Sequence, residues 1–211
     1  MLLFFSMRLA PALVFCVTLC SAPDFAHLPG SPRAAMASTF VELSVAELVS
    51  KSNLVVAGTP LDARSLWEDD QGGRGRRIVT YTHLRIDRVI DGQVTGELWV
   101  RTLGGEVGDV GQHVDGEAVL TTSKPALLFL RALADGTHAV VGMAQGHYPL
   151  DTPSDGTPIR LLPPRDVGRL VGKVTPTPLA QGQLPARLVL SGQTLDAAAK
   201  LVWAERRVHA P

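Results

Sequence analysis

The chain has 211 residues, in which 20 Lys plus Arg balance 20 Asp plus Glu, so the formal net charge is zero. Its 45% hydrophobic and 19% charged residues are typical of a globular chain and argue against a disordered one. The length suits one domain, or one domain with an appendage. Nucleic-acid binders usually carry a basic excess that displaces phosphate counterions, so the balanced charge excludes a general polyanion binder.

The N-terminal sequence predicts export. Residues 9–20 form an uncharged apolar run after Arg8, which is too short to span a bilayer but has the length of a signal-peptide core. Cleavage is expected either after Ala22, directly behind the run, or after Ala37, behind an A-x-A triplet. We assign residues 1–37 to the signal peptide and expect a periplasmic or extracellular protein.

The two cysteines, Cys16 and Cys20, both lie in this apolar run. Lipidation at Cys20 is a third alternative, which the large side chain of Leu19 just before it disfavours. Cleavage after Ala37 leaves 174 residues with no cysteine and a net charge of −1. We therefore expect a mature chain that is held by apolar packing and has no disulfide, no transmembrane segment and no nucleic-acid partner.

The first patterned segments of the mature chain predict a helix, a strand and a loop. Ser44 and Glu47 have the spacing of a capping box, which predicts a helix over residues 45–51. Residues 53–58 are a short β-branched run typical of a strand. Residues 61–77 are rich in charge and glycine, and we expect them to form a mobile hairpin loop.

The middle of the chain predicts a series of short strands. Residues 77–90 show the longest alternation of apolar and polar residues, and the break at residues 88–90 indicates a bulge. Asp-Gly pairs, which favour tight turns, begin at positions 91, 115, 135 and 155. Further strands are expected over residues 97–102, 125–133, 137–142, 147–150 and 159–162.

The C-terminal part predicts an irregular segment followed by a helix. Residues 163–193 are rich in Pro and Gly and lack sustained periodicity. Residues 194–207 have an N-cap threonine, an apolar stripe and two terminal arginines, which together indicate a helix. A helix of this length needs a surface to pack against, so we expect it to dock on the β domain, residues 38–162.

Five or six short strands, one of them long and bulged, predict a mainly β fold. We favour an antiparallel, partly open five- to six-stranded barrel of OB type, with a short N-terminal helix and the C-terminal helix. A small sandwich is the alternative, although sandwiches usually have about seven strands of more even length.

The order of these segments resembles a family of uncharacterised secreted bacterial proteins. The resemblance implies a signal peptide followed by a small OB-like barrel, similar to that of netrin modules and metalloproteinase inhibitors. It implies no established activity and no catalytic residues. The chain lacks the N-terminal cysteine with which those inhibitors chelate a protease metal, unless Cys20 becomes the mature terminus. The matching segments are residues 53–58, 78–82, 89–92, 102–108, 127–130 and 146–150, within a region of residues 44–150, to which the terminal helix is added.

One group of side chains could hold a metal ion. His113, Asp115 and Glu117 alternate, so on a strand all three would point to one face and could ligate zinc or supply a base. The Asp115-Gly116 pair favours a turn instead, which would leave three solvated side chains.

A second group could bind a partner. Tyr81 and Trp99 lie on the strand faces opposite the aliphatic residues, and arginines near them could form a basic patch. We attribute the neighbouring polar series His83, Arg85 and Asp87 to cross-strand ion pairs. The candidate binding residues are Arg74, Arg76, Arg77, Tyr81, Trp99 and Arg101.

The chain contains no P-loop, G-x-S-x-G, H-E-x-x-H, C-x-x-C or EF-hand spacing. We therefore expect no cofactor and a non-catalytic exported binding or adaptor domain. Its partner would be an unknown protein or a component of the cell envelope. The alternatives are a secreted protease inhibitor, or a metal-dependent enzyme that uses His113, Asp115 and Glu117.

Overall fold

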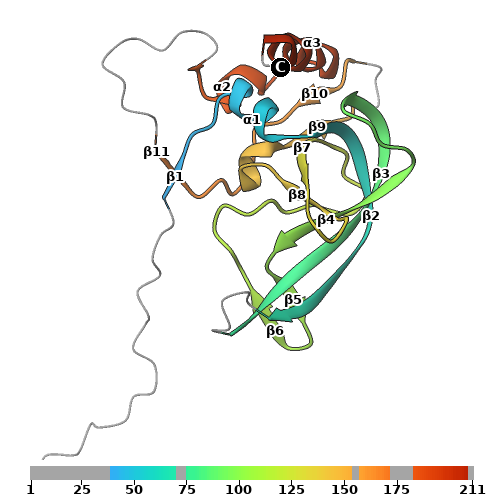
Figure 1. Ribbon diagram of the computed structural model, residues 1–211, viewed down its shortest axis with the longest axis vertical. Helices are drawn as coiled ribbons and strands as arrows, with labels where there is room; N and C mark the ends of the chain where they lie inside the picture. Colours follow the sequence, from blue (N-terminus) through green and yellow to red (C-terminus); the bar gives the residue numbers. More distant parts are fainter. Residues whose placement is uncertain (1–38, 70–74, 154–156, 172–182, 209–211) are drawn as a thin grey trace, which may run out of the picture. The chain divides into compact units, whose positions relative to one another are not determined.

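A computed structural model of the chain describes residues 39–69, 75–153, 157–171 and 183–208 (Figure 1). These residues belong to one compact unit. The fold is mainly β, as predicted, and its described part contains a seven-stranded sheet, two two-stranded sheets and three α-helices.

Three predictions concern residues outside this description, namely the signal peptide of residues 1–37, Cys20 and Arg74. None of the helices within the described ranges is long and apolar enough to cross a membrane.

Helix α1 (Val45–Lys51) begins at the predicted capping box. The Ser44 hydroxyl accepts a hydrogen bond from the Glu47 N–H at 3.3 Å, and a Glu47 carboxylate oxygen accepts one from the Ser44 N–H at 2.9 Å. Leu48 and Val49 are fully buried. The helix is therefore stabilised both by its cap and by packing, which a seven-residue helix requires.

The longest hairpin joins β2 (Leu54–Asp69) and β3 (Arg76–Asp91), each of 16 residues. The mobile loop predicted for residues 61–77 is therefore wrong for residues 61–69 and 76–77, because β2 continues to Asp69 and pairs with β3 from Val55 to Asp69. The charged residues of this segment indicated that it is exposed to solvent. A two-stranded arm is as exposed as a loop, and it also pairs its backbone N–H and C=O groups.

The register of this hairpin shifts at three places. Val55 pairs with Asp91 and Val56 with Val89, so Ile90 has no opposite residue and the predicted bulge is confirmed. Another shift follows Pro60, whose missing N–H explains why the ladder is interrupted there.

The seven-stranded sheet has the order β10-β9-β7-β2-β3-β4-β8. In addition β7 pairs with β8, and β8 pairs in parallel with β4 at Val100 and His138. The sheet is thus partly mixed, which corrects the prediction of a purely antiparallel one. Sequence alternation does not specify strand direction, so this pairing could not be predicted locally. The remaining strands of the sheet are β4 (Glu97–Leu103), β7 (Ala126–Ala132), β8 (His138–Val140), β9 (His147–Asp151) and β10 (Arg160–Leu161).

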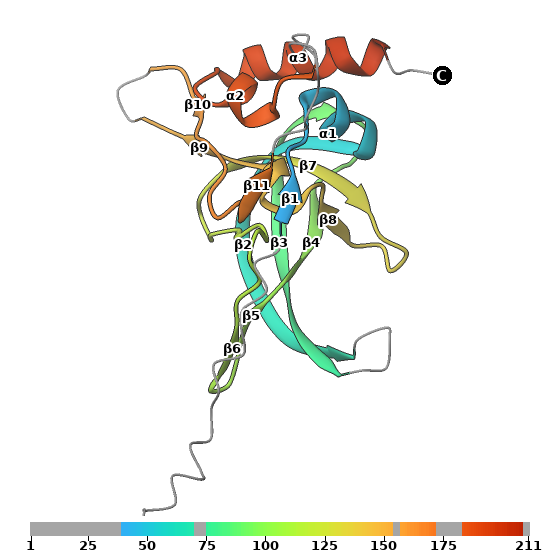
Figure 2. The same ribbon diagram turned by 90° about the vertical axis from the view of Figure 1, so that its left-hand side faces the viewer.

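The smaller elements include several that the sequence did not predict. The segment expected to be irregular over residues 163–193 contains β11 (Arg169–Val171), which pairs in parallel with β1 (Thr39–Val41), and α2 (Ala186–Leu190). A 3₁₀ helix, η1 (Met143–Gly146), precedes β9. The hairpin of β5 (Gly105–Val107) and β6 (Val110–Gln112) lies near the distal part of the β2–β3 arm (Figures 1 and 2).

Glycine is required where β5 approaches the β2–β3 arm. A Cβ atom on Gly105 would lie 2.3 Å from the Thr80 hydroxyl oxygen and 2.4 Å from that of Ser65, and Gly105 has a φ of +128°. The Thr80 hydroxyl donates a hydrogen bond to the Gly104 carbonyl at 2.7 Å. The Gly104-Gly105 pair therefore lets the backbone at the start of β5 lie in close contact with the β2–β3 arm.

Buried side chains form two cores on opposite faces of the central strands. The helix-side core lies between the sheet and α1, α2 and α3, which gather at one end in both views (Figures 1 and 2). The strand-side core lies among the strands themselves. Residues of β7 alternate between them, with Leu127 and Phe129 in the first and Leu128 and Leu130 in the second. This double burial explains why β7 is a continuous apolar run.

Helix α3 (Leu195–Val208) confirms the predicted C-terminal helix. The Thr194 hydroxyl accepts a hydrogen bond from the Ala197 N–H at 3.2 Å, as an N-cap does. The Trp203 indole N–H donates to the Ile90 carbonyl at 2.6 Å, which ties α3 to the end of β3.

Candidate functional site

The outer faces of β3 and β4 carry a cluster of aromatic and charged side chains. Tyr81 pairs with Arg101 and His83 with Trp99, so the four lie on one face of the two strands. The described helices, α1, α2 and α3, lie instead at the end of β7 and β9 in Figure 1. We call the surface the aromatic face, and it consists of Asp62, Glu68, Tyr81, His83, Glu97, Trp99 and Arg101.

Trp99 is the most exposed ring of the aromatic face, with 41% of its surface accessible. The His83 ring stacks on it at a centroid distance of 4.6 Å and an interplanar angle of 14°. His83 Nδ1 lies 3.3 Å from an Asp62 carboxylate oxygen, and His83 Nε2 lies 2.9 Å from a Glu97 carboxylate oxygen. Carboxylates on both sides fix the imidazole, and the imidazole in turn fixes one face of the indole.

The other half of the aromatic face is a hydrogen-bonded network around Glu68. Arg101 donates to both carboxylate oxygens of Glu68, and the Tyr81 hydroxyl donates to Glu68 Oε1 at 2.5 Å. The side chains of Arg101 and Glu68 are only 17% and 22% exposed. The hydrogen bond from Arg101 holds the pKa of Glu68 below its usual value, whereas burial and then the Glu68 carboxylate raise the pKa of Tyr81.

The predicted arginines lie in different surroundings. Arg101 is paired with Glu68, and Arg76 lies 5.6 Å from the centroid of the Trp67 ring and 3.6 Å from an Asp69 oxygen. Arg77 is half-buried in the same arm. The carboxylates of Asp62 and Glu97 lie against His83, which stacks on Trp99. Arg64 lies opposite Tyr81 and Arg85 opposite Glu97 in the strand register, so this surface carries both signs of charge rather than a basic patch.

His113, Asp115 and Glu117 lie in the turn region that follows β6. His113 Nε2 and an Asp115 oxygen are 3.4 Å apart, and both side chains are exposed. Glu117 instead accepts a hydrogen bond from the Ala118 N–H at 3.0 Å, and burial raises the pKa of its carboxyl group. Among the described residues, no group of three or more His, Cys, Asp or Glu side chains is placed to hold a metal ion.

The chain was also compared with known proteins. No protein-family model and no curated protein matches it. Its function is therefore argued from the geometry of its own residues.

Sequence reasoning found Tyr81, Trp99 and Arg101 but missed the acidic residues that organise them. Glu68 and Asp62 fall in the segment that we expected to be a loop. Residues 62–69 show no apolar and polar alternation, and Leu66 and Trp67 are adjacent, so the extension of the strand beyond Pro60 depends on its pairing with β3. The cross-strand ion pairs predicted for His83, Arg85 and Asp87 are found in part. His83 contacts carboxylates on both neighbouring strands, whereas Arg85 pairs with Asp87 on its own strand.

Proposed function

We propose that this chain is an exported, non-catalytic binding or adaptor domain whose partner docks on the aromatic face. The observation that carries the proposal is Trp99, a large ring that is 41% exposed and already held in one orientation by His83. Tryptophan, tyrosine and arginine dominate the energetics of binding surfaces. A ring that is ordered before binding loses little conformational entropy when the partner arrives.

The proposed scaffold is a partly open five-stranded barrel of OB type. What supports it is the order of pairings, because β7, β2, β3, β4 and β8 pair in succession and β8 pairs again with β7. Barrels of this type bind ligands on the face of their second and third strands, which correspond here to β3 and β4. The resemblance of the sequence to secreted OB-like proteins agrees with this scaffold.

The proposed partner is a protein or a component of the cell envelope, met in the periplasm or outside the cell. The signal-like pattern of residues 1–37 supports export. Asp62 and Glu97 contact the histidine that stacks on Trp99, which favours a partner that offers hydroxyl, amide or basic groups there. The zero net charge of the chain disfavours a polyanion such as a nucleic acid.

The site is proposed to be non-catalytic because of how its histidine is held. Both ring nitrogens of His83 face carboxylates, so neither is directed at a nucleophile. Glu68 is likewise occupied by Arg101 and Tyr81. These groups position a binding surface rather than move protons.

The proposal is tested by co-sedimentation of the exported protein with isolated cell envelopes of the producing bacterium. We expect saturable retention, which Trp99→Ala weakens about tenfold or more because a central anchor is removed. Trp203→Ala is the matched control, since Trp203 is 44% exposed but lies on α3, outside the aromatic face.

Unfolding curves of both variants verify that each is folded. Equal retention of the wild type and Trp99→Ala, or no retention of the wild type, would contradict the proposed binding face.

A further inference from the structure

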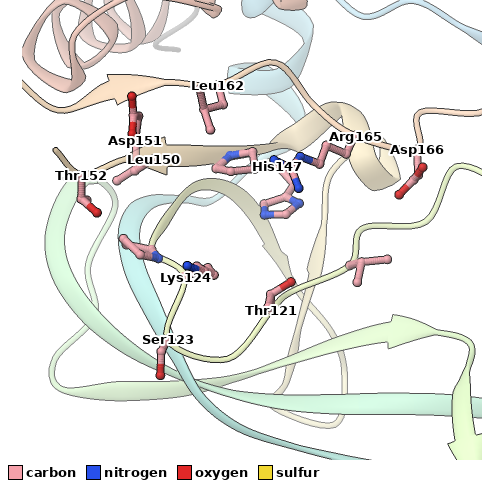
Figure 3. A pocket seen from close by; sticks show the side chains of 13 residues that line it. Thr121, Ser123, Lys124, His147, Leu150, Asp151, Thr152, Leu162, Arg165 and Asp166 are labelled. Atoms are coloured by element: carbon pink, nitrogen blue, oxygen red, sulfur yellow. The ribbon is translucent and has the colours of Figure 1, made fainter.

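A cavity of about 540 Å³, drawn in Figure 3, is lined by none of the residues of the aromatic face. Its walls come from three segments that are distant in sequence, which are residues 119–125 before β7, residues 147–152 of β9 and its end, and residues 162–166. The volume is within the range of small-molecule sites, about 300–1,000 Å³.

Backbone hydrogen bonds join these three segments. The Leu150 N–H donates to the Pro125 carbonyl at 2.9 Å, and the Leu162 N–H donates to the Pro149 carbonyl at 2.8 Å. β9 also pairs with β7, where His147 lies opposite Leu128. The walls formed by Pro125, residues 147–151 and Leu162 are therefore joined through the backbone of the sheet, and Arg165 follows Leu162 in an irregular segment.

His147 is the buried polar group of the cavity. Its side chain lines the cavity beside Arg165 (Figure 3), although the residue is only 7% exposed. Within the described ranges, neither of its ring nitrogens has a hydrogen-bond partner. Burial, and next the charge of Arg165, lower the pKa of His147 to about 4. The imidazole is thus neutral at pH 7 and offers one donor and one acceptor.

Two cations line the same cavity. Lys124 and Arg165 form no ion pair or hydrogen bond with another side chain in the part of the chain that is described. The carboxylates of Asp151 and Asp166 also belong to the walls, and all four charged residues are exposed. In Figure 3 the two carboxylates lie toward opposite ends of the cavity, with His147 and Arg165 between them. The charge that acts on His147 is that of Arg165, so a positive charge lies beside the imidazole.

The rest of the lining combines the hydroxyl residues Thr121, Ser123 and Thr152 with an apolar part. Val119, Leu150 and Leu162 contribute side chains, and Pro125 and Pro149 add their rings. A ligand that fits must combine an apolar body with a negative group, because apolar walls favour the first and the unpaired cations favour the second.

We propose that this cavity binds a small organic anion, a carboxylate or a phosphomonoester, through Arg165 and Lys124, with His147 as a hydrogen-bonding partner. The planar guanidinium of Arg165 matches two oxygens of either oxyanion, and Lys124 adds a second positive charge. The site is separate from the aromatic face and does not depend on the function proposed for it.

Calorimetric titration of the exported protein tests the proposal with benzoate, phenyl phosphate, inorganic phosphate and the neutral benzyl alcohol. We expect saturable binding of benzoate or phenyl phosphate, and the stronger of the two identifies the preferred oxyanion. Arg165→Gln and Lys124→Gln should each weaken it about tenfold or more. Lys200→Gln removes an exposed charge from α3 and should leave the affinity unchanged.

Ring resonances in a proton–carbon NMR spectrum locate the bound anion. The expected result is a shift of the His147 signals on titration while those of His83, on the aromatic face, stay in place. Unchanged His147 signals, equal affinity for benzyl alcohol, full affinity in Arg165→Gln, or no saturation by any of the three anions up to about 10 mM would each overturn the proposal.

Discussion

Two outer surfaces of the same sheet differ in whether helices cover them. Over β2 and β7, apolar side chains such as Val55 and Phe129 are completely buried beneath α1, α2 and α3. Over β3 and β4, no apolar layer forms, and Glu68, Arg101 and Tyr81 satisfy one another by hydrogen bonds. The covered surface needs its aromatic residues for stability. The exposed ring of Trp99 has no such structural reason, which makes the uncovered surface the place to look for function.

The largest expected effect separates the two surfaces directly. Phe129→Ala should lower the free energy of unfolding by about 3–5 kcal/mol, because it leaves a cavity in the helix-side core and removes the edge-to-face contact with Tyr148. Trp99→Ala should cost less than about 1 kcal/mol, because its ring is exposed on one side. Urea unfolding of both variants measures the difference.

A loss near 3 kcal/mol for Trp99→Ala would remove the distinction. The aromatic face would then be a structural element, and the argument for docking at Trp99 would fail.

The second effect is a pH dependence of the free energy of unfolding, which arises because burial disfavours protonation of His147. The pKa of His147 is lowered from 6.5 to about 4 by burial and by Arg165. As the pH falls from about 6.5 to about 4, the unfolded chain binds a proton that the folded chain does not, so the free energy of unfolding decreases by up to about 3 kcal/mol. Above pH 6.5 the effect is absent.

His147→Gln should abolish the part of this pH-dependent loss of stability that is due to His147. Because burial also lowers the pKa of His138, the loss in the variant must be subtracted from the loss in the wild type. Lys124, Arg165, Asp151 and Asp166 face the same cavity, but they are retained in both proteins. If the wild type and His147→Gln lose stability in parallel between pH 6.5 and 4, His147 is not the group responsible.

The smallest expected change in stability comes from a substitution in the aromatic face. Glu68→Gln should cost about 1–2 kcal/mol at pH 7, because it removes the charge-assisted hydrogen bonds of Arg101 and weakens that of Tyr81. The lowered pKa of Glu68 means that the ionised carboxylate stabilises the fold above the ordinary value of 4.5, and that this stabilisation is lost as the pH falls below it.

Denaturant unfolding at pH 7 and at successively lower pH should therefore show the wild type and Glu68→Gln converging. A constant difference across this range would mean that the carboxylate charge is not what holds Arg101.

Much of the local structure followed from sequence patterns. The capping box at Ser44, the bulge at Ile90 and the helix after Thr194 are each determined by residues within a few positions of one another. Tyr81 and Trp99 could be placed on polar strand faces for the same reason, since alternation alone assigns the face of a strand.

The candidate site was only partly predictable. Its acidic residues, Asp62 and Glu68, were read as loop charges because charge and glycine content do not distinguish a solvated loop from a solvated two-stranded arm. The strand β11 and helix α2 lie in a segment without periodicity, and they form through pairing with β1 and packing in the helix-side core.

The sequence by itself determined a mainly β chain with a helix near each end, one long bulged strand and a pair of aromatic residues away from the apolar faces. Only the tertiary structure decided that β8 pairs with both β4 and β7, that Glu68 meets Arg101, and that His147 lies beside Arg165. The physical reason is distance along the chain. Short-range patterns specify turns, caps and faces, whereas contacts between distant residues depend on which strands pair and in which register.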